Sequence, residues 1–200
     1  MTDGGFHYRF EAGSSPAALA LHGTGGNEES LVDVARFVFP NSAILSPRGQ
    51  SLDEGVPRFF CRLREGVFDT ADMEVKTREL AEFLESFLKA KDLAPPYDVI
   101  GYSNGANMGL SLLFRRPELI RNLVLLRPMV PFEPSADLDL GGSAALICAG
   151  QADPIVPRLE SIRLEGLLLK HGASVDLHWV NGGHNLSRDE LEFARRWAEA

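Results

Sequence analysis

Short apolar runs alternate with longer amphipathic segments along all 200 residues of the chain. A short apolar run bounded by turn-forming residues is typical of a buried strand, and an apolar stripe that recurs every three to four residues is typical of a helix. The alternation predicts a parallel sheet covered by helices. The predicted strands are residues 7–11, 17–22, 43–46, 98–102, 123–127, 144–149 and 175–180, and the predicted helices are residues 29–39, 73–92, 104–115, 159–171 and 189–198.

Length and composition limit the class of protein. A chain of 200 residues can bury one sizeable core but is too short for two ordinary domains, so residues 1–200 are expected to form one domain. Its 44% hydrophobic and 24% charged residues are typical of a soluble globular protein. A formal net charge of -8 would repel DNA or an anionic membrane, so neither nucleic acid nor a membrane is an expected partner.

Cysteine usage and the amino terminus point to a reducing compartment. The two cysteines, Cys61 and Cys148, support neither a disulfide framework nor a zinc site, and Cys148 lies in an apolar run that predicts a buried free thiol. The first ten residues lack the basic start and apolar stretch of a secretion signal, and no run of eighteen apolar residues predicts a membrane span. The cytoplasm is the expected location.

The first candidate for chemistry is Ser103, in a Gly-x-Ser-x-Gly motif at residues 101–105. An apolar strand runs into the motif and a helical pattern follows, which is the context of a nucleophile elbow that holds a serine hydroxyl above a sheet. Glycines two positions before and after the serine let the backbones approach closely enough for that turn. The backbone N–H of Asn104 is a candidate oxyanion donor. The alternative is a glycine-rich turn without chemistry.

A second glycine-rich loop, residues 23–26, follows the predicted strand at residues 17–22. A tetrahedral intermediate needs two N–H donors at one oxygen, and loss of one typically costs about 3 kcal/mol, so the Thr24 N–H is the second candidate donor. The alternative is a phosphate cradle, although the loop lacks the lysine of a P-loop and the spacing of a dinucleotide site. His22 is expected to position this loop.

A candidate acid and a candidate base each follow a later strand. Asp153 comes after residues 144–149, where its carboxylate would accept the N–H of a histidine and stabilise the imidazolium; the alternative is an Asp-Pro turn former. His184 comes after residues 175–180 and a glycine pair. The remaining histidines, His7, His171 and His178, are explained structurally.

Ser103, Asp153 and His184 share one position relative to the predicted sheet. Each lies just beyond the carboxyl end of a predicted parallel strand, the edge at which open α/β sheets place their sites. They also occur in the chain order Ser, Asp, His that follows a nucleophile elbow. The three residues are therefore a candidate catalytic triad.

With these residues in place, the chain resembles the phospholipase/carboxylesterase family of α/β-hydrolases, which includes acyl-protein thioesterases and small bacterial carboxylesterases. The resemblance runs over nearly the whole chain. Its marks are LHGTGGNE at 21–28, SPRG at 46–49, PRFF at 57–60, GVFD at 66–69, GYSNGANM at 101–108, GQADPIVP at 150–157 and GGHNLS at 182–187.

This resemblance implies a single-domain α/β-hydrolase fold, with a mostly parallel sheet and helices on both faces. It implies ester or thioester hydrolysis through an acyl-enzyme and without a cofactor, by a triad that matches Ser103, His184 and Asp153. Oxyanion donors match Thr24 and Asn104. A small-molecule ester is the implied substrate, and a homodimer is expected because related enzymes are often dimers. The PRFF stretch is most similar to a bacterial branch associated with aromatic and quinone catabolism.

The short segment 128–143 predicts an open site without a large lid domain, and hence a preference for short to medium acyl esters. The expected pocket walls are Phe59, Phe60, Met129 and Phe132. Arg48, Arg58, Arg62 and Arg64 could meet an acidic substrate, although most are expected to be surface ion-pair partners. The alternatives are a long-chain thioesterase or lysophospholipase, a lactonase, and a hydrolase-fold binding protein with little turnover.

Overall fold

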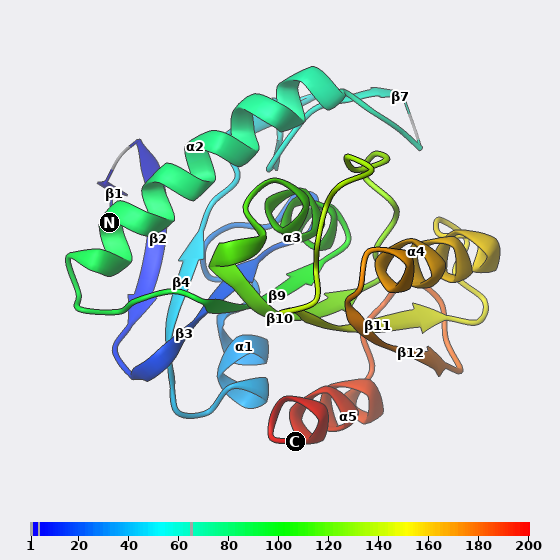
Figure 1. Cartoon of the computed structure of the whole chain (residues 1–200). Coiled ribbons are helices and arrows are strands. Elements are labelled where there is room, and N and C mark those ends of the chain that lie inside the picture. The colour runs from blue at the N-terminus through cyan, green and yellow to red at the C-terminus, as the bar shows by residue number, and fades with distance from the viewer. Residues whose placement is uncertain (1, 4, 65) are drawn as a thin grey trace.

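An eight-stranded sheet in the order β1-β2-β4-β3-β9-β10-β11-β12 runs through the computed structural model, which describes residues 2–3, 5–64 and 66–200 (Figure 1). The first two strands are antiparallel to their neighbours, and β4, β3, β9, β10, β11 and β12 are parallel. The strands are β1 (Thr2–Asp3), β2 (Phe6–Glu11), β3 (Ser14–Leu21), β4 (Ser42–Pro47), β9 (Tyr97–Tyr102), β10 (Ile120–Leu126), β11 (Ala144–Gly150) and β12 (Ser174–Val180).

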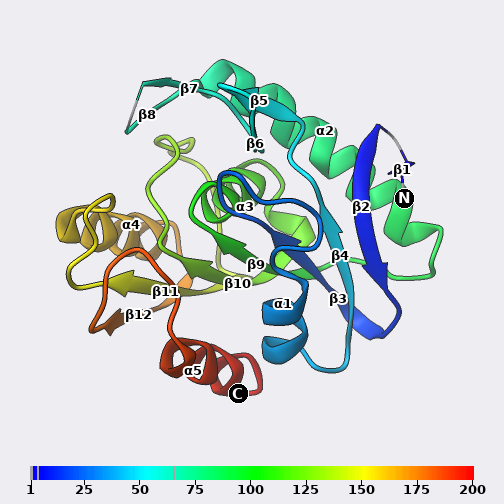
Figure 2. The ribbon, with the colours of Figure 1, turned by 180° about the vertical axis from the view of Figure 1, so that it is seen from behind.

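Helices cover both faces of this sheet (Figures 1 and 2). One face carries α2 (Thr70–Lys89), α3 (Asn104–Arg115) and α4 (Arg158–Lys170), and the other carries α1 (Val32–Val38) and α5 (Arg188–Ala198). A 3-10 helix, η1 (Pro117–Leu119), connects α3 to β10. Each face has its own apolar core, because the buried strands present side chains alternately to the two helical layers. The predicted α/β architecture is confirmed.

Capping residues fix where two of the helices begin. The Asp69 carboxylate accepts hydrogen bonds from the amides of Ala71 and Asp72 at the start of α2, 3.2 and 3.0 Å away. At the start of α5, Ser187 and Glu190 form a capping box in which each side chain accepts from the other residue's backbone N–H. The short polar signals before these helices therefore satisfy amides that the helices leave unpaired.

All the predicted strands and helices occur, with ends shifted by up to three residues; the first helix begins at Val32 instead of residue 29. The sequence did not predict two small antiparallel hairpins, because strands of two or three residues are too short to show an alternating pattern. The first pairs β5 (Ser51–Asp53) with β6 (Val56–Arg58), and the second pairs β7 (Arg62–Arg64) with β8 (Val67–Phe68).

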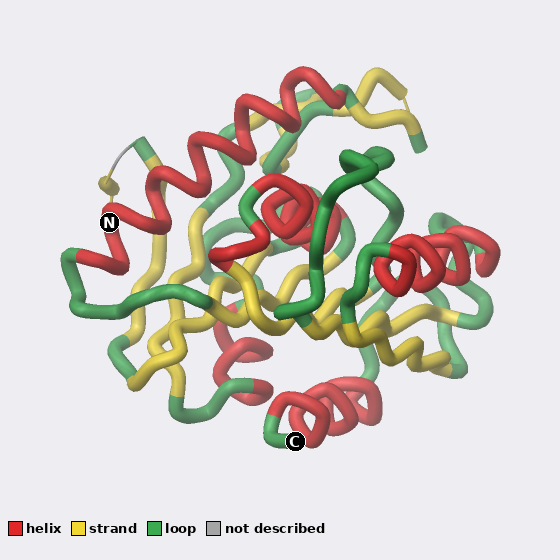
Figure 3. Tube along the Cα trace, viewed as in Figure 1, coloured by secondary structure: helices red, strands yellow, loops and turns green. Residues whose placement is uncertain are grey.

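The described residues form no lid domain between the carboxyl edge of the sheet and solvent. The described chain between β10 and β11 forms neither helix nor strand, and Figure 3 shows it as a loop that rises beside α3. None of the helices in residues 2–3, 5–64 and 66–200 has the length and apolar character that crossing a membrane requires. Cys148 is buried as expected, and its burial raises the pKa of the thiol to about 12.

Candidate active site

Ser103 occupies a sharp turn between β9 and α3. Its φ of +51° and ψ of -112° lie in a region that non-glycine residues rarely adopt. The flanking glycines make the turn possible: a Cβ at Gly101 would lie 2.6 Å from the Gly105 carbonyl oxygen, and a Cβ at Gly105 would lie 2.0 Å from the Leu21 carbonyl oxygen. The turn therefore has the strained, closely packed geometry of a nucleophile elbow.

Hydrogen bonds connect Ser103, His184 and Asp153 in one row. The Nε2 atom of His184 lies 3.0 Å from the Ser103 Oγ, and its Nδ1 atom lies 2.8 Å from the Asp153 Oδ2. A charged carboxylate can only accept, so Nδ1 carries the proton and Nε2 is left to accept the serine proton. The structure thus brings together three residues that lie on different strand ends.

Asp153 is held in its charged form by donors on both of its oxygens. Its Oδ1 accepts from the amides of Ile155 at 2.8 Å and Val156 at 3.0 Å, and its Oδ2 faces His184. Burial alone would raise the pKa of this carboxyl, but the two amide hydrogen bonds and the histidine lower it below its ordinary value. The turn after β11 therefore presents a carboxylate in a fixed orientation.

The loop that carries His184 is attached to a buried arginine. Arg127 donates from Nε to the Gly183 carbonyl and from Nη2 to the Asn185 carbonyl, both at 2.8 Å. It also makes a two-armed ion pair with Glu190, and its Nε lies 3.9 Å from the Asp153 Oδ2. Arg127 therefore fixes the backbone on both sides of His184.

Sequence reasoning did not identify Arg127 or Glu190 as parts of this site. Arg127 closes an apolar strand pattern, and a charged residue in that position was the available signal. Glu190 stands at the start of the helix predicted at residues 189–198, where a negative charge is favourable without any further function. Its carboxylate serves two functions, because it completes the capping box with Ser187 and pairs with Arg127.

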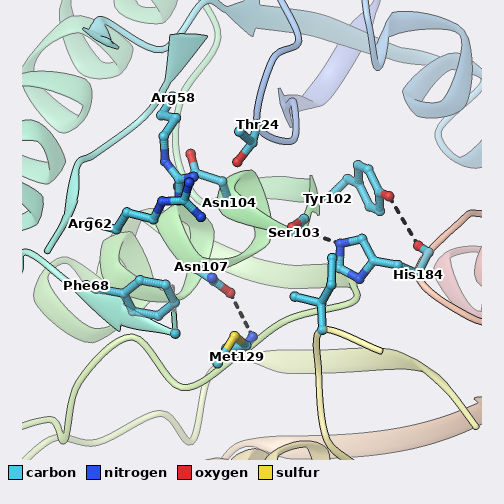
Figure 4. A pocket seen from close by; sticks show the side chains of 12 residues that line it. Thr24, Arg58, Arg62, Phe68, Tyr102, Ser103, Asn104, Asn107, Met129 and His184 are labelled. Atoms are coloured by element: carbon cyan, nitrogen blue, oxygen red, sulfur yellow. Dashed lines mark hydrogen bonds between the residues drawn. The ribbon is translucent and has the colours of Figure 1, made fainter. Parts of the chain in front are cut away.

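Thr24 and Asn104, whose backbone N–H groups are the candidate oxyanion donors, line the same cavity as Ser103 (Figure 4). Asn104 opens α3, where the first backbone N–H groups have no acceptor within the helix and the helix dipole favours negative charge. The amides of the two residues after Thr24 are already used, because Gly25 donates to the Pro57 carbonyl and Gly26 to the Gly23 carbonyl. The Thr24 loop is therefore held in place beside Ser103 by its glycines.

His22 positions the glycine-rich loop, as expected. Its ring is buried, with Nδ1 2.7 Å from the Gly23 carbonyl oxygen and Nε2 accepting from the Gly49 amide at 3.0 Å. Burial lowers the pKa of His22, which favours its neutral form. The phosphate-cradle alternative loses its main support, because α1 begins only at Val32 and the loop does not stand at a helix N-terminus.

A cavity of about 330 Å³ opens over Ser103 and His184. Besides these two residues, its described lining comprises Thr24, Arg58, Arg62, Gly66, Phe68, Tyr102, Asn104, Asn107, Met129 and Ile155. The two hairpins supply one side of the cavity through Arg58, Arg62 and Phe68 (Figure 4). Among the residues described, no group of three or more His, Cys, Asp or Glu side chains could hold a metal ion.

The expected pocket walls need correction. Met129 lines the cavity, its amide held by the Asn107 Oδ1 at 2.8 Å, but the three phenylalanines do not. Phe59 and Phe60 are buried in the core, and Phe132 packs against Phe114. Aromatic side chains contribute most when fully buried, and the sequence does not show which side of a short hairpin faces the core.

The four arginines divide between surface and cavity. Arg48 forms an ion pair with Glu28, as expected of a surface arginine, and Arg64 is exposed. Arg58 and Arg62 instead line the cavity and face one shared carboxylate, that of Asp53. Two of the four therefore reach the site.

A strained serine after a central parallel strand, with an aspartate and a histidine beyond later strands, defines the α/β-hydrolase class. The chain belongs to the phospholipase/carboxylesterase family, whose model matches residues 12–200. The family resemblance noted in the sequence is thus confirmed, and the chain is a hydrolase of this family.

Relatives match over almost their whole length. The chain is 42% identical over 195 residues to "Putative hydrolase MhqD" of Bacillus subtilis (strain 168). The aligned region covers 94% of this chain and 95% of the relative. The solved carboxylesterase of Bacillus cereus matches with a TM-score of 0.93 and 41% identity, over 97% of this chain and 93% of that one. YahD, solved with malic acid, matches with a TM-score of 0.89 and 28% identity, over 97% and 98%.

Proposed function

We propose that this protein is a serine carboxylesterase in which Ser103 is the nucleophile, His184 the general base and Asp153 the residue that orients the histidine. The hydrogen-bonded row carries the proposal, with Ser103 Oγ 3.0 Å from His184 Nε2 and His184 Nδ1 2.8 Å from Asp153 Oδ2. These distances suit a serine hydroxyl that passes its proton to a histidine held in one tautomer. The row also lies at a cavity large enough for a small ligand.

The first half of the reaction forms an acyl-enzyme. Oγ of Ser103 attacks the ester carbonyl carbon while its proton moves to Nε2 of His184, and the carbonyl oxygen takes up the negative charge. When the tetrahedral intermediate collapses, the bond to the leaving oxygen breaks and His184 returns the proton to it. An alcohol leaves, and the acyl group stays on Ser103.

The second half of the reaction returns the free enzyme. His184 takes a proton from water, the hydroxide oxygen bonds to the acyl carbon, and the bond to the Ser103 oxygen breaks as that oxygen regains the proton. In both halves the backbone N–H groups of Thr24 and Asn104 stabilise the oxyanion. They are supported in this function by their position beside Ser103 and by the open first turn of α3.

Short to medium acyl esters are the proposed substrates. A cavity of about 330 Å³, over which the described residues form no lid domain, encloses only a short apolar chain. A longer chain would leave its outer methylenes in water, where each gains less than the ~0.8 kcal/mol of full burial. The malic acid in the YahD structure is a small polar molecule of this size range.

Active-site labelling with a fluorophosphonate probe, together with ester turnover, tests the nucleophile. Wild type should be labelled at Ser103. Ser103→Ala should remain folded but should not be labelled, and its kcat should fall at least about a thousandfold. Ser86→Ala is the matched control, because this serine is exposed on α2, and it should keep both properties. A folded Ser103→Ala variant within about tenfold of wild type would disprove the assignment.

A further inference from the structure

Two guanidinium groups line the cavity beside the Ser103 hydroxyl. Arg58 comes from β6 and Arg62 from β7, and Figure 4 shows both side chains on the side of the cavity away from His184. The Arg58 side chain is only 7% exposed, and that of Arg62 is 37% exposed. A charged group as buried as that of Arg58 rarely lacks partners. The groups that pair with the two guanidinium groups therefore determine whether they can bind a ligand.

One carboxylate faces both arginines. The Asp53 Oδ2 accepts from the Arg62 Nε at 2.8 Å and lies 3.7 Å from the Arg58 Nη1. Two positive charges therefore face one negative charge, and no acidic residue is among those described in the cavity lining. Burial, and then the neighbouring Arg62 charge, lower the pKa of Arg58, as is typical of a cation that is incompletely neutralised.

A structural function explains only part of this arrangement. Arg58 donates from Nε to the Phe60 carbonyl at 3.2 Å, which helps to hold the hairpin segment, but a guanidinium carries five N–H donors. Next to it, Asn104 accepts the Phe59 amide at 2.8 Å through Oδ1. Among the described residues, the Nδ2 of Asn104 is the buried side-chain polar atom left without a hydrogen-bond partner. The remaining N–H donors of Arg58 and of the Asn104 side chain thus lie on one side of the cavity.

The charge of the whole chain makes this cluster of donors unusual. With a net charge of -8, the protein on average repels anions. The positively charged cavity wall is opposite in sign to this average charge. A carboxylate fits the planar fork of an arginine, and such charge-assisted hydrogen bonds strengthen where water is partly excluded. An anionic ligand would also complete the partial neutralisation by Asp53.

We propose that Arg58 and Arg62 bind a carboxylate carried by the ester substrate, so that the preferred substrates are esters with an acidic acyl or leaving group. The proposal rests on the esterase activity proposed above and narrows its substrate class. Of the two arginines, Arg62 is the better one to vary, because it is more exposed and its loss leaves the buried Arg58 paired with Asp53.

Two matched substrate pairs test the proposal and separate the two positions of the acid. Monoethyl glutarate against ethyl pentanoate places the charge on the acyl side, and 4-acetoxybenzoate against 4-acetoxybenzamide places it on the leaving group. The quantity measured is the ratio of kcat/KM for the acid to that for its neutral partner. Wild type should favour the acid at least tenfold in one pair, which corresponds to about 1.4 kcal/mol.

Variants of two neighbouring arginines complete the test. Arg62→Gln should reduce the preferred ratio at least fivefold, whereas Arg64→Gln should leave it within twofold of wild type. Arg64→Gln is the matched control, because Arg64 lies on the same strand as Arg62 and its substitution removes the same charge. Arg64 does not line the described cavity. Raising the ionic strength should also lower the wild-type ratio, because salt screens the attraction.

The outcomes separate this proposal from the esterase activity. Hydrolysis of the neutral esters through Ser103 without preference for either acid would overturn the carboxylate site and leave the esterase standing. Equal effects of Arg62→Gln and Arg64→Gln on the ratio would also overturn it, because only general charge would then matter. If no ester is hydrolysed and the fluorophosphonate probe does not label Ser103, the esterase proposal fails and the carboxylate site falls with it.

Discussion

Arg127 and Glu190 form an ion pair that is completely enclosed by protein. The Nη1 of Arg127 lies 2.6 Å from the Oε2 of Glu190, the Nη2 lies 3.1 Å from the Oε1, and the two side chains are 1% and 0% exposed. The pair joins the end of β10 to the first turn of α5, and the loop with His184 runs between them. The position of the histidine therefore depends on a charge pair outside the cavity.

Arg127→Met should destabilise the protein by about 3–5 kcal/mol, because it leaves the Glu190 carboxylate buried without its partner. It should also lower kcat, since the carbonyls of Gly183 and Asn185 lose their donors. Urea unfolding and ester turnover measure the two effects. In the double variant Arg127→Met/Glu190→Leu, stability should recover in part while kcat stays low. If stability and kcat recovered to the same extent in the double variant, Arg127 would not be the residue that positions His184.

The sequence predicted the sheet and its helices because their signals are long. The stripe through Leu80, Leu84 and Leu88 covers several turns of α2, and it is buried against the sheet. The hairpins around Arg58 and Arg62 have strands of two or three residues, so their arrangement depends on tertiary contacts that the sequence does not display. These hairpins supply one wall of the cavity.

Gly105→Ala should prevent folding or strongly destabilise the protein, because its Cβ would lie 2.0 Å from the backbone oxygen of Leu21. The Gly105 and Leu21 backbones cannot move apart unless β3 moves away from α3. The matched control is Gly166→Ala in α4, where a Cβ meets nothing within 4 Å. That change should stabilise the protein by about 0.5–1 kcal/mol through helix propensity. Thermal unfolding compares the two, and a stable Gly105→Ala would disprove the close approach.

Asp153→Asn should lower kcat by several orders of magnitude, because an amide cannot stabilise the imidazolium that forms during attack. In wild type the pKa of Asp153 lies below its ordinary value, so this carboxyl group is charged at neutral pH. Steady-state ester turnover at neutral pH measures the effect of the substitution. A folded Asp153→Asn variant with full activity would remove Asp153 from the mechanism.

The same lowered pKa predicts how stability depends on pH. A carboxyl whose pKa is lower in the folded chain stabilises the fold fully above its unfolded pKa, about 3.9, and this contribution is lost as pH falls through the folded pKa. The free energy of unfolding of wild type minus that of Asp153→Asn should thus shrink as pH falls below about 4. Denaturant unfolding across this range checks the sign, and a difference that grows would contradict it.

The triad candidates were visible in the sequence because each follows an apolar strand that the chain order places at one sheet edge. The walls of the cavity were not, since Phe59 and Phe68 look alike in the sequence although one is buried and the other lines the cavity. Arg127 was hidden for a related reason. Its partners are three backbone carbonyls, those of Cys148, Gly183 and Asn185, and a glutamate far along the chain.

The acyl-chain preference should depend on Phe68, whose ring lines the cavity. In wild type, kcat/KM should rise through short acyl chains to roughly eight carbons and then level off, because further methylenes gain less than the ~0.8 kcal/mol of full burial. Phe68→Ala should extend the rise to longer chains, since this ring lines the cavity. Phe60→Ala is the matched control: its ring packs on Phe68 with centroids 5.3 Å apart but is fully buried.

Phe60→Ala should therefore cost about 3–5 kcal/mol of stability without extending the chain-length preference. Esters of two to roughly sixteen carbons, assayed below micelle-forming concentrations, give the profile for wild type and for both variants. A smooth rise to the longest chain in wild type would favour a long-chain thioesterase or lysophospholipase. An extension in Phe60→Ala but not in Phe68→Ala would mean that Phe68 does not limit the cavity, because only the ring that bounds the acyl chain can change which chains fit.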